Sequence, residues 1–341
     1  MIRIILVALA FIVVTLLLLP LQLIGLAFEP RLQRMIPHLY HRILCALIGV
    51  RIREVGQRST DAPALILSNH VSWLDICVIT ALAPVVFVAK SEVAGWPVLG
   101  WLARLQRTVF INRKARHQTG AATGEIASRL LAGDAVVLFA EGTSSDGIHV
   151  LPFRSSLVGA VHHALGSSTH HTHVTVQPMS VAYVGFSGVP MGRGLRERVA
   201  WYGDADLIPH LLNVLSSGAV DVTVSWGEAT AHDMSTDRKA IARDAEKSVR
   251  RMTAAALRAA APVPSSTRTV PAGRAGLTSM TGPHLAASAQ ARHNAVPLAL
   301  HPYRTHPCKF ATSGAPASAF PLSASAATIS ANAPTSTPRA R

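Results

Sequence analysis

A histidine and an aspartate five residues apart, His70 and Asp75, are the side chains in this sequence best placed to do acid–base chemistry. The apolar run at residues 64–67 predicts a buried strand before them, and residues 73–82 predict a helix after them. His70 therefore follows the carboxyl end of a strand, where open α/β sheets bind ligands. If the chain turns tightly into the helix, Asp75 folds back and fixes the tautomer of His70. The other ring nitrogen can then take a proton, as a general base does.

The spacing alone does not show that His70 and Asp75 form a catalytic pair. The chain has 16 histidines, so one of them can precede an aspartate by five residues by chance. A helix start capped by Ser72 or Asp75 gives the same pattern. Three further polar stretches follow strand-like runs or come soon after them. They are Phe110-Ile111-Asn112-Arg113, Glu141-Gly142-Thr143-Ser144-Ser145 and Leu151-Pro152-Phe153-Arg154. Arginine suits phosphate or carboxylate recognition because it donates two parallel hydrogen bonds. Taken singly, each stretch also fits a capped loop with solvated charge.

In combination and in this order, these segments resemble the motifs of the glycerolipid acyltransferase family, whose familiar members are 1-acylglycerol-3-phosphate acyltransferases. His70 and Asp75 match the family's His-x4-Asp motif. Residues 110–113 match its second motif, Glu141-Gly142-Thr143 its third, and the apolar, proline-containing residues 176–181 its fourth. The resemblance covers residues 50–226 and implies an acyltransferase with an α/β fold.

The resemblance also implies a mechanism. His70 would deprotonate the free hydroxyl of a lysolipid, Asp75 would orient His70, and the alkoxide would attack the thioester of acyl-CoA or acyl carrier protein. No cofactor and no metal is required. The residues implied to bind substrate are Arg113, Glu141, Gly142, Thr143 and Arg154. No serine stands in a Gly-x-Ser-x-Gly nucleophile elbow, which agrees with direct transfer.

Two departures from the family pattern bear on the acceptor. Ser144 stands where the third motif usually has arginine, and Arg107 stands where the second usually opens with glycine. The main expectation is 1-acylglycerol-3-phosphate, with its phosphate held by Arg113 and helped by Arg154 or Arg107. The alternative is lyso-ornithine lipid, because residues 141–153 and 201–204 resemble the bacterial branch that includes lyso-ornithine lipid acyltransferases. An alternative of another class is a non-catalytic, membrane-anchored binding protein.

The amino-terminal segment predicts attachment to a membrane. Residues 4–28 are almost all apolar, and a helix of that length spans roughly 37 Å, more than a hydrocarbon core of roughly 30 Å. Pro20 leaves open whether residues 1–29 cross the bilayer or re-enter the same leaflet. Residues 30–49 predict an amphipathic helix. The arginines that follow place the body on the cytoplasmic side of the cell inner membrane.

The rest of the chain predicts an acyltransferase domain at residues 50–261 and a disordered, low-complexity tail at 262–341. The fold expected is α/β, with a central mixed sheet flanked by helices. Strands are predicted at residues 52–55, 64–67, 85–89, 108–111, 135–139, 174–183 and 220–226. Helices are predicted at residues 73–82, 97–105, 117–131, 155–165, 207–215 and 236–259.

The net charge of +14 does not indicate nucleic acid as a partner. Half of the excess lies in the tail, which has seven Lys or Arg and no acid, and no RNA-binding or zinc-finger signature is present. The remaining charge suits anionic lipid head groups, so the partners expected are membrane lipid, a lysolipid acceptor and the thioester donor. Three scattered cysteines argue against a disulfide framework. Five histidines at residues 162–173 fit a solvated turn better than a metal site.

Overall fold

The computed structural model describes residues 2–112 and 119–260, and every structural statement below concerns these residues. The strands are β1 Val50–Val55, β2 Ala64–Ser68, β3 Val86–Lys90, β4 Val109–Ile111, β5 Ala135–Phe139, β6 Val174–Phe186, β7 Val189–Pro190, β8 Val220–Trp226 and β9 Thr230–His232. The helices are α1 Ile2–Phe28, α2 Pro30–Ile48, α3 Leu74–Leu82, η1 Ser91–Gly95, α4 Leu99–Leu105, α5 Thr119–Leu131, α6 Ala160–Gly166, α7 Arg193–Arg196, α8 Leu207–Ser216 and α9 Arg238–Ala259.

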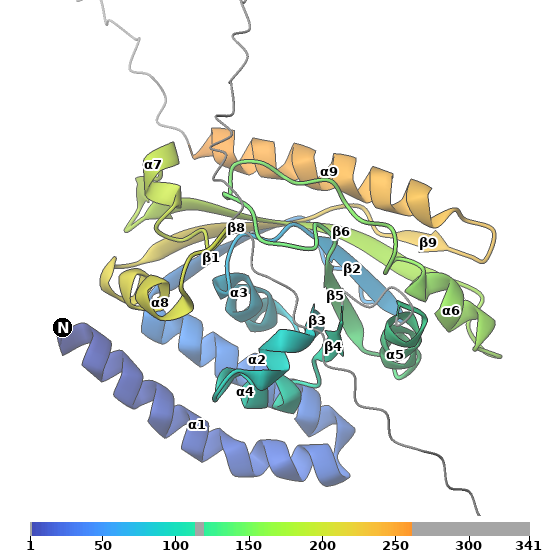
Figure 1. Cartoon of the computed structure of the whole chain (residues 1–341), viewed down its shortest axis with the longest axis horizontal. Helices are drawn as coiled ribbons and strands as arrows, with labels where there is room; N and C mark the ends of the chain where they lie inside the picture. The colour runs from blue at the N-terminus through green and yellow to red at the C-terminus, as the bar shows by residue number, and fades with distance from the viewer. Residues whose placement is uncertain (1, 113–118, 261–341) are drawn as a thin grey trace, which may run out of the picture. The chain divides into compact units, whose positions relative to one another are not determined.

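The strands form one mixed sheet in the order β1-β8-β6-β2-β5-β3-β4, and β7 and β9 pair with β6. Along this order only the β6–β8 pair is antiparallel. Helices cover both faces of the sheet, as Figure 1 shows, with α9 on one side and α2, α3 and α4 on the other. The predicted α/β class and central mixed sheet are confirmed.

Most predicted elements are present within two residues of their expected ends. The exception among the helices is α6, which begins at Ala160 and not at residue 155. Residues 155–159 form turns, because the Ser155-Ser156 pair and Gly159 favour turns over helix. The short elements η1, α7, β7 and β9 were not predicted, since segments of two to five residues carry too little periodicity.

Each face of the sheet has its own hydrophobic core, and this explains why the central strands lack polar alternation. In β2, Ile66 packs with α3 on one face, whereas Leu65 and Leu67 pack with α5, α6 and α9 on the other. All five residues of β2 are buried. A strand covered on both faces is apolar throughout, as the unbroken run in the sequence indicated.

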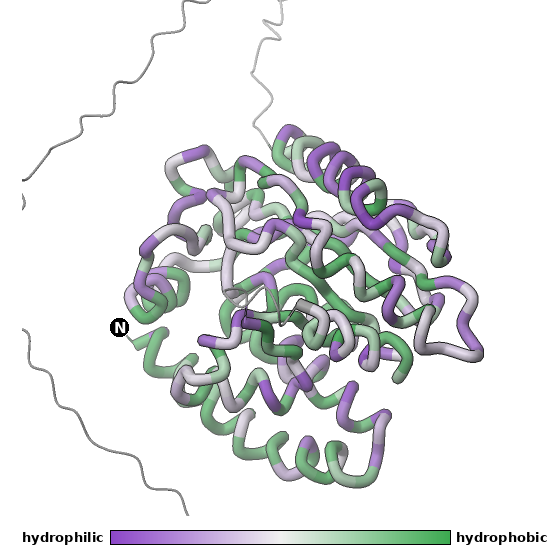
Figure 2. Tube along the Cα trace, turned by 45° about the vertical axis from the view of Figure 1, so that its right-hand side comes forward, coloured by the Kyte–Doolittle hydropathy of each residue, from purple (hydrophilic) through white to green (hydrophobic). Residues whose placement is uncertain are grey.

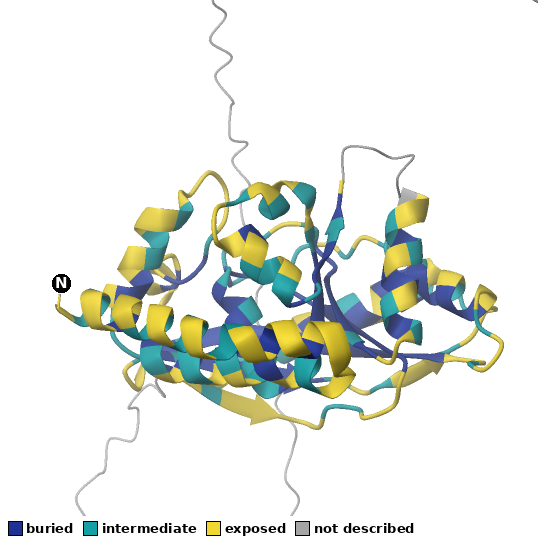
Figure 3. Cartoon of the chain, turned by 90° about the horizontal axis from the view of Figure 1, so that it is seen from below, coloured by how far each residue is buried: buried dark blue, intermediate teal, exposed yellow. Residues whose placement is uncertain are grey.

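Helices α1 and α2 form an antiparallel hairpin against the α3 side of the body. At its closed end, a Cβ on Gly25 would lie 2.6 Å from the backbone nitrogen of Gln33, so only glycine allows the two helices to approach this closely. Further along, the Thr15 and Tyr40 hydroxyls are 3.0 Å apart. Helix α1 is apolar along its length (Figure 2) and exposed on its outer side (Figure 3). It is long and apolar enough to cross a membrane.

Candidate active site

The turn from β2 into α3 brings the predicted pair into contact. His70 Nδ1 lies 2.8 Å from Asp75 Oδ2, and the backbone N–H groups of Val71 and Ser72 donate to the same oxygen at 2.7 and 3.0 Å. Asp75 is completely buried. Because a carboxylate accepts hydrogen bonds, Nδ1 must carry the proton when His70 is neutral, and Nε2 is then the basic nitrogen.

The imidazole ring of His70 is held flat against an aromatic side chain. It stacks on Phe139 at the end of β5, with centroids 4.0 Å apart and planes at 16°. Phe139 in turn stacks on Phe87 of β3. The His70 side chain keeps 18% of its surface exposed, and Nε2 has no hydrogen-bond partner within the described ranges. The ring is therefore oriented by the protein and still accessible to a substrate.

Asn69, which the sequence analysis did not single out, fixes the point at which the chain leaves the sheet. Its side-chain amide donates to the Val181 carbonyl at 2.9 Å and its oxygen accepts from the Val181 N–H at 2.8 Å. These two bonds take the place of the next rung of the β2–β6 ladder. The backbone is released into the turn one residue before His70, so the turn starts at a defined place.

A second residue that sequence reasoning missed is Tyr183 on β6. Its hydroxyl donates to Asp75 Oδ1 at 2.7 Å, and the side chain is 1% exposed. Asp75 thus receives hydrogen bonds from His70, two backbone N–H groups and one phenol. A fully buried carboxylate needs such partners to remain ionised.

The third predicted motif follows β5, the parallel neighbour of β2, so Glu141 and His70 occupy adjacent strand ends. Ser145 ties the two segments together, because its N–H and its hydroxyl both donate to the His70 carbonyl, at 2.8 and 3.1 Å. Gly142 has a φ of 78°, a left-handed conformation that favours glycine. Thr143 is exposed on this loop.

Glu141 lies beneath the loop and not on its surface. The residue is 2% exposed, and neither carboxyl oxygen makes a well-formed hydrogen bond with the described residues. Burial raises the pKa of this carboxyl to about 8, and the negative charge of Asp75 contributes to the rise. Nearby N–H groups of Leu151 and His70 act in the opposite direction. The protonated, neutral form of Glu141 therefore dominates at neutral pH.

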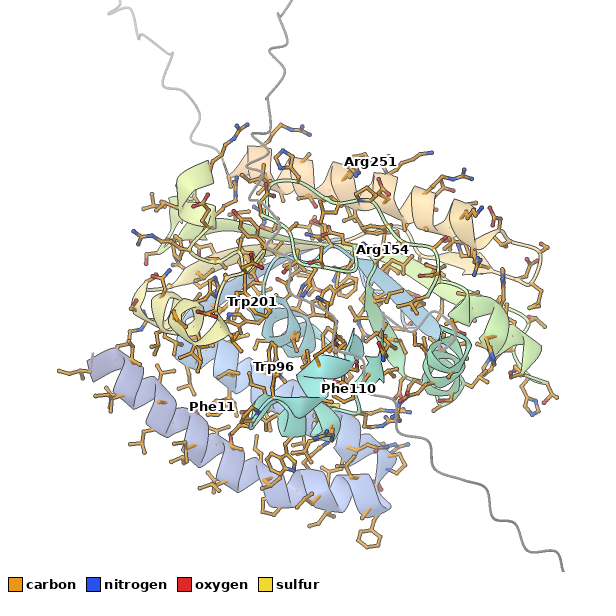
Figure 4. All side chains as sticks on the ribbon, in the orientation of Figure 1. Phe11, Trp96, Phe110, Arg154, Trp201 and Arg251 are labelled. Atoms are coloured by element: carbon orange, nitrogen blue, oxygen red, sulfur yellow. The ribbon has the colours of Figure 1, made fainter. Side chains whose placement is uncertain are left out.

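Arg154 presents a guanidinium beside this loop (Figure 4). The backbone N–H of Arg154 donates to the Ala140 carbonyl at 2.8 Å, and its side-chain Nε atom would lie 3.1 Å from a Cβ built on Gly142. The side chain is exposed, and no ion pair to it is seen within residues 2–112 and 119–260. Arg154 is thus placed to bind an anion. Arg113, also predicted to bind substrate, lies outside the described residues.

Arg107 does not fit the role that the sequence indicated, because it is already engaged. Its guanidinium makes a two-point contact with Asp134, at 2.9 and 2.8 Å, and Arg34 of α2 contacts the same carboxylate at 2.9 Å. The Arg107 backbone has a φ of 63°, which explains why glycine is usual at this position. The arginine helps to hold α2 on the body and offers no free cation to a phosphate.

An apolar cavity of about 370 Å³ lies between the α1–α2 hairpin and the body. Helices α1, α2, α3, α4 and α8 supply its walls, which include Phe11, Trp73, Trp96 and Leu211. The backbone N–H of Trp201 donates to the Val71 carbonyl at 2.9 Å, and its ring meets that of Trp96 edge to face at a centroid distance of 6.1 Å (Figure 4). The cavity wall is therefore connected to the turn that carries His70 through Trp73 and Trp201.

Comparison with known proteins identifies the family of this chain. The sequence profile described as Acyltransferase matches residues 49–182, which contain both His70 and Asp75. A lyso-ornithine lipid O-acyltransferase of Brucella abortus is 48% identical over 75% of this chain and 96% of its own length. The protein of the same name from Rhizobium meliloti is 42% identical over 75% of this chain and 88% of its own length.

A third relative has a different name. It is a 1-acyl-sn-glycerol-3-phosphate acyltransferase of Neisseria meningitidis, 31% identical over 62% of this chain and 78% of its own length. All three similarities extend well beyond the motifs, since they cover more than half of this chain. This chain therefore belongs to the acyltransferase family that its His-x4-Asp motif indicated, and it is an acyltransferase.

Proposed function

We propose that this protein is a lyso-ornithine lipid O-acyltransferase, which moves an acyl chain from a thioester donor to the free hydroxyl of lyso-ornithine lipid. The observation that carries the proposal is the 48% identity over 96% of a relative with that name. The 1-acyl-sn-glycerol-3-phosphate acyltransferase of Neisseria meningitidis is less similar, at 31% identity. The acceptor proposed is thus the alternative from the sequence and not its main expectation.

The geometry supports direct transfer with His70 as the general base. Nε2 takes the proton of the acceptor hydroxyl while that oxygen bonds to the thioester carbonyl carbon. Asp75, 2.8 Å from Nδ1, balances the imidazolium charge that results. When the tetrahedral intermediate collapses, the C–S bond breaks and the imidazolium returns the proton to the leaving thiolate. The products are the acylated lipid and free CoA or free acyl carrier protein, and no enzyme-bound acyl group forms.

The chemistry around Arg154 supports an acceptor whose head group is an amino acid. An ornithine head carries one carboxylate and one ammonium, so its net charge is near zero. Arg154 can bind the carboxylate through two hydrogen bonds, and the Thr143 hydroxyl is exposed on the same loop. Ser144, in place of the usual arginine, removes a cation that would repel the ammonium. Glu141, being buried, would shape this loop together with Gly142 and not touch the head group.

The cavity supports a place for an acyl chain at the membrane side of the molecule. Its walls are almost wholly apolar, and they include both helices of the α1–α2 hairpin. A long acyl chain bound there would contact apolar side chains instead of water. We assign to this cavity the acyl chain of the donor thioester, whether acyl-CoA or acyl carrier protein.

The contacts of α1 support attachment to one face of a membrane, and the arginines that follow α1 favour the cytoplasmic face of the inner membrane. Near the start of α1, Arg3 donates to the Ile48 and Gly218 carbonyls at 2.6 and 3.1 Å. Near its end, Gln22 donates to the Leu105 carbonyl at 2.6 Å. A helix with both ends tied to the body cannot cross the bilayer away from it. Of the two arrangements open from sequence, re-entry into one leaflet therefore fits better than a crossing.

A competition assay tests the acceptor. Purified protein in mixed micelles is given equal amounts of lyso-ornithine lipid and 1-acylglycerol-3-phosphate, with a labelled acyl thioester. We expect acylated ornithine lipid to dominate, and Ser144→Arg to lower its formation by roughly tenfold because the new cation repels the ammonium. Preference for 1-acylglycerol-3-phosphate, with Ser144→Arg improving it, would overturn the proposal. No transfer to any lysolipid would favour the non-catalytic binding protein.

A further inference from the structure

We propose that Tyr183 is a positioning residue for catalysis, which fixes the Asp75 carboxylate and lowers the proton affinity of the His70–Asp75 pair. The proposal rests on the function given above only in taking this pair as the general base. It does not depend on which lysolipid is the acceptor.

The geometry of the contact carries the proposal. The Tyr183 hydroxyl donates to Asp75 Oδ1 at 2.7 Å, whereas the three other hydrogen bonds to this carboxylate all reach Oδ2. Tyr183 is therefore the one side chain, within the described ranges, that holds the second oxygen. With both oxygens fixed, the carboxylate plane cannot rotate, and the direction from Oδ2 to the imidazole is set.

The backbone of β6 is irregular at this residue. The pairing of β6 with β8 shifts register between Tyr183 and Gly185, which makes Val184 the extra residue of a bulge. Bulges re-aim side chains and are common beside active sites. The tyrosine carbonyl also accepts a long hydrogen bond from Arg196 Nε, at 3.4 Å. The bulge thus lies directly beside the residue whose phenol contacts Asp75 of α3.

The surroundings keep Tyr183 a hydrogen-bond donor throughout an assay range. Burial, followed by the negative charge of Asp75, raises its pKa well above that of free tyrosine. The other titratable groups facing it are Cys77 on α3 and Cys45 on α2, and burial raises the pKa of both thiols as well. Glu141 beyond β5 titrates at about 8, so it affects the alkaline side of a pH profile. The acid side of the profile reports protonation of the general base, which is the His70–Asp75 pair.

The sign of the effect follows from the charge on Asp75. A hydrogen bond to the charged form of a carboxylate stabilises that form and lowers its affinity for a proton. Without the Tyr183 hydroxyl, the pair binds its first proton more tightly, whether that proton resides on His70 or on Asp75. The base is then protonated at a higher pH, and the acid limb of kcat/KM moves upward.

The test compares the deletion of two buried hydroxyl groups. Tyr183→Phe removes the bond to Asp75. Thr253→Val on α9, outside the matched motifs, removes another buried hydroxyl bond of 2.7 Å, to Ser180, and serves as the control. Both variants are assayed with the lysolipid that the wild-type protein accepts, whichever one that is. Failure of the wild type with every lysolipid would refute the proposed function itself, before any variant is compared.

For Tyr183→Phe we expect the acid limb to move up by roughly 0.5–1 pH unit and kcat to fall about 10- to 100-fold, with KM changed less than threefold. Thr253→Val should lose thermal stability and keep the wild-type profile. Should Tyr183→Phe lose stability in the same way with an unmoved acid limb, the residue is only structural and the proposal fails. If the phenylalanine variant does not fold, a fluorotyrosine at position 183, a stronger donor, must move the acid limb downward, and an unmoved or raised limb contradicts the proposal.

Discussion

Replacing Glu141 with glutamine tests whether a buried, protonated carboxyl makes this fold less stable as the pH rises. The folded-state pKa of about 8 lies above the ordinary value of 4.5. The folded chain therefore keeps a proton that the unfolded chain gives up. The stability due to this proton is complete below pH 4.5 and is lost as the pH rises towards 8. Glutamine carries no titratable proton, so Glu141→Gln should not show this loss.

The size of the effect follows from the gap between the two pKa values. That gap is roughly 3.5 pH units, or about 5 kcal/mol over the whole window, because each unit is worth about 1.4 kcal/mol. Between about pH 5.5 and pH 8.5 the expected loss is about 3 kcal/mol. Glu141 is 2% exposed, so solvent screening reduces this figure little. For a chain of this size the loss corresponds to a Tm difference of roughly 6–12 °C.

The measurement is thermal unfolding in detergent at several pH values, followed by tryptophan fluorescence. The Tm of Glu141→Gln minus that of the wild type should grow steadily more positive from about pH 5.5 to about pH 8.5. Glu228→Gln, at an exposed glutamate, supplies the matched control and should follow the wild type at every pH. A Tm difference for Glu141→Gln that stays constant with pH would refute the reasoning, since it would mean that Glu141 is ionised in the folded protein.

Two further predictions concern the substrates. Arg154→Ala should raise the steady-state KM for the acceptor about 10- to 100-fold, because a charge-assisted, two-point contact is lost. Arg251→Ala on α9 is the control and should leave this KM unchanged. Equal KM values for the two variants would exclude Arg154 as the anion site. Leu211→Trp should fill part of the cavity and lower kcat/KM for long donor chains roughly 50-fold relative to donors three methylenes shorter, at about 0.8 kcal/mol per methylene. Leu212→Trp, on the exposed side of α8, is the control and should follow the wild type with the same donor series. If Leu211→Trp does not change the dependence of kcat/KM on chain length, the acyl chain binds elsewhere.

Local patterns explain which parts of this site are predictable from sequence. His70 and Asp75 are five residues apart across one turn, so their contact depends on a strand end and a helix start that periodicity already indicates. The nearness of Glu141 to His70 follows from a general rule, because parallel neighbouring strands end at the same edge. These features predict the sheet, the contact between His70 and Asp75, and the position of the third motif. The comparisons support the family assigned from them.

The contacts that escaped prediction are those between segments distant in sequence. Tyr183 is 108 residues from Asp75, and Asn69 is 112 residues from Val181. In the sequence, Tyr183 is only an aromatic residue in an apolar strand, where core packing is the ordinary expectation. Arg107 was misjudged for a related reason. Its partner Asp134 lies 27 residues away, directly before β5, and nothing in the local sequence marks the pair. Side-chain partners across strands depend on register and bulges, which residue patterns do not encode.

The most direct test of the central claim is the rate of acyl transfer by His70→Gln in purified, folded protein. Glutamine can still hydrogen-bond to Asp75 but cannot take up a proton, so kcat should fall at least about 10²- to 10⁴-fold while Tm stays within a few degrees of the wild-type value. The control is His149→Gln, which removes a second, exposed histidine–aspartate pair of similar geometry and should leave kcat unchanged. A His70→Gln protein that transfers acyl chains at the wild-type rate would contradict the account of His70 as the general base.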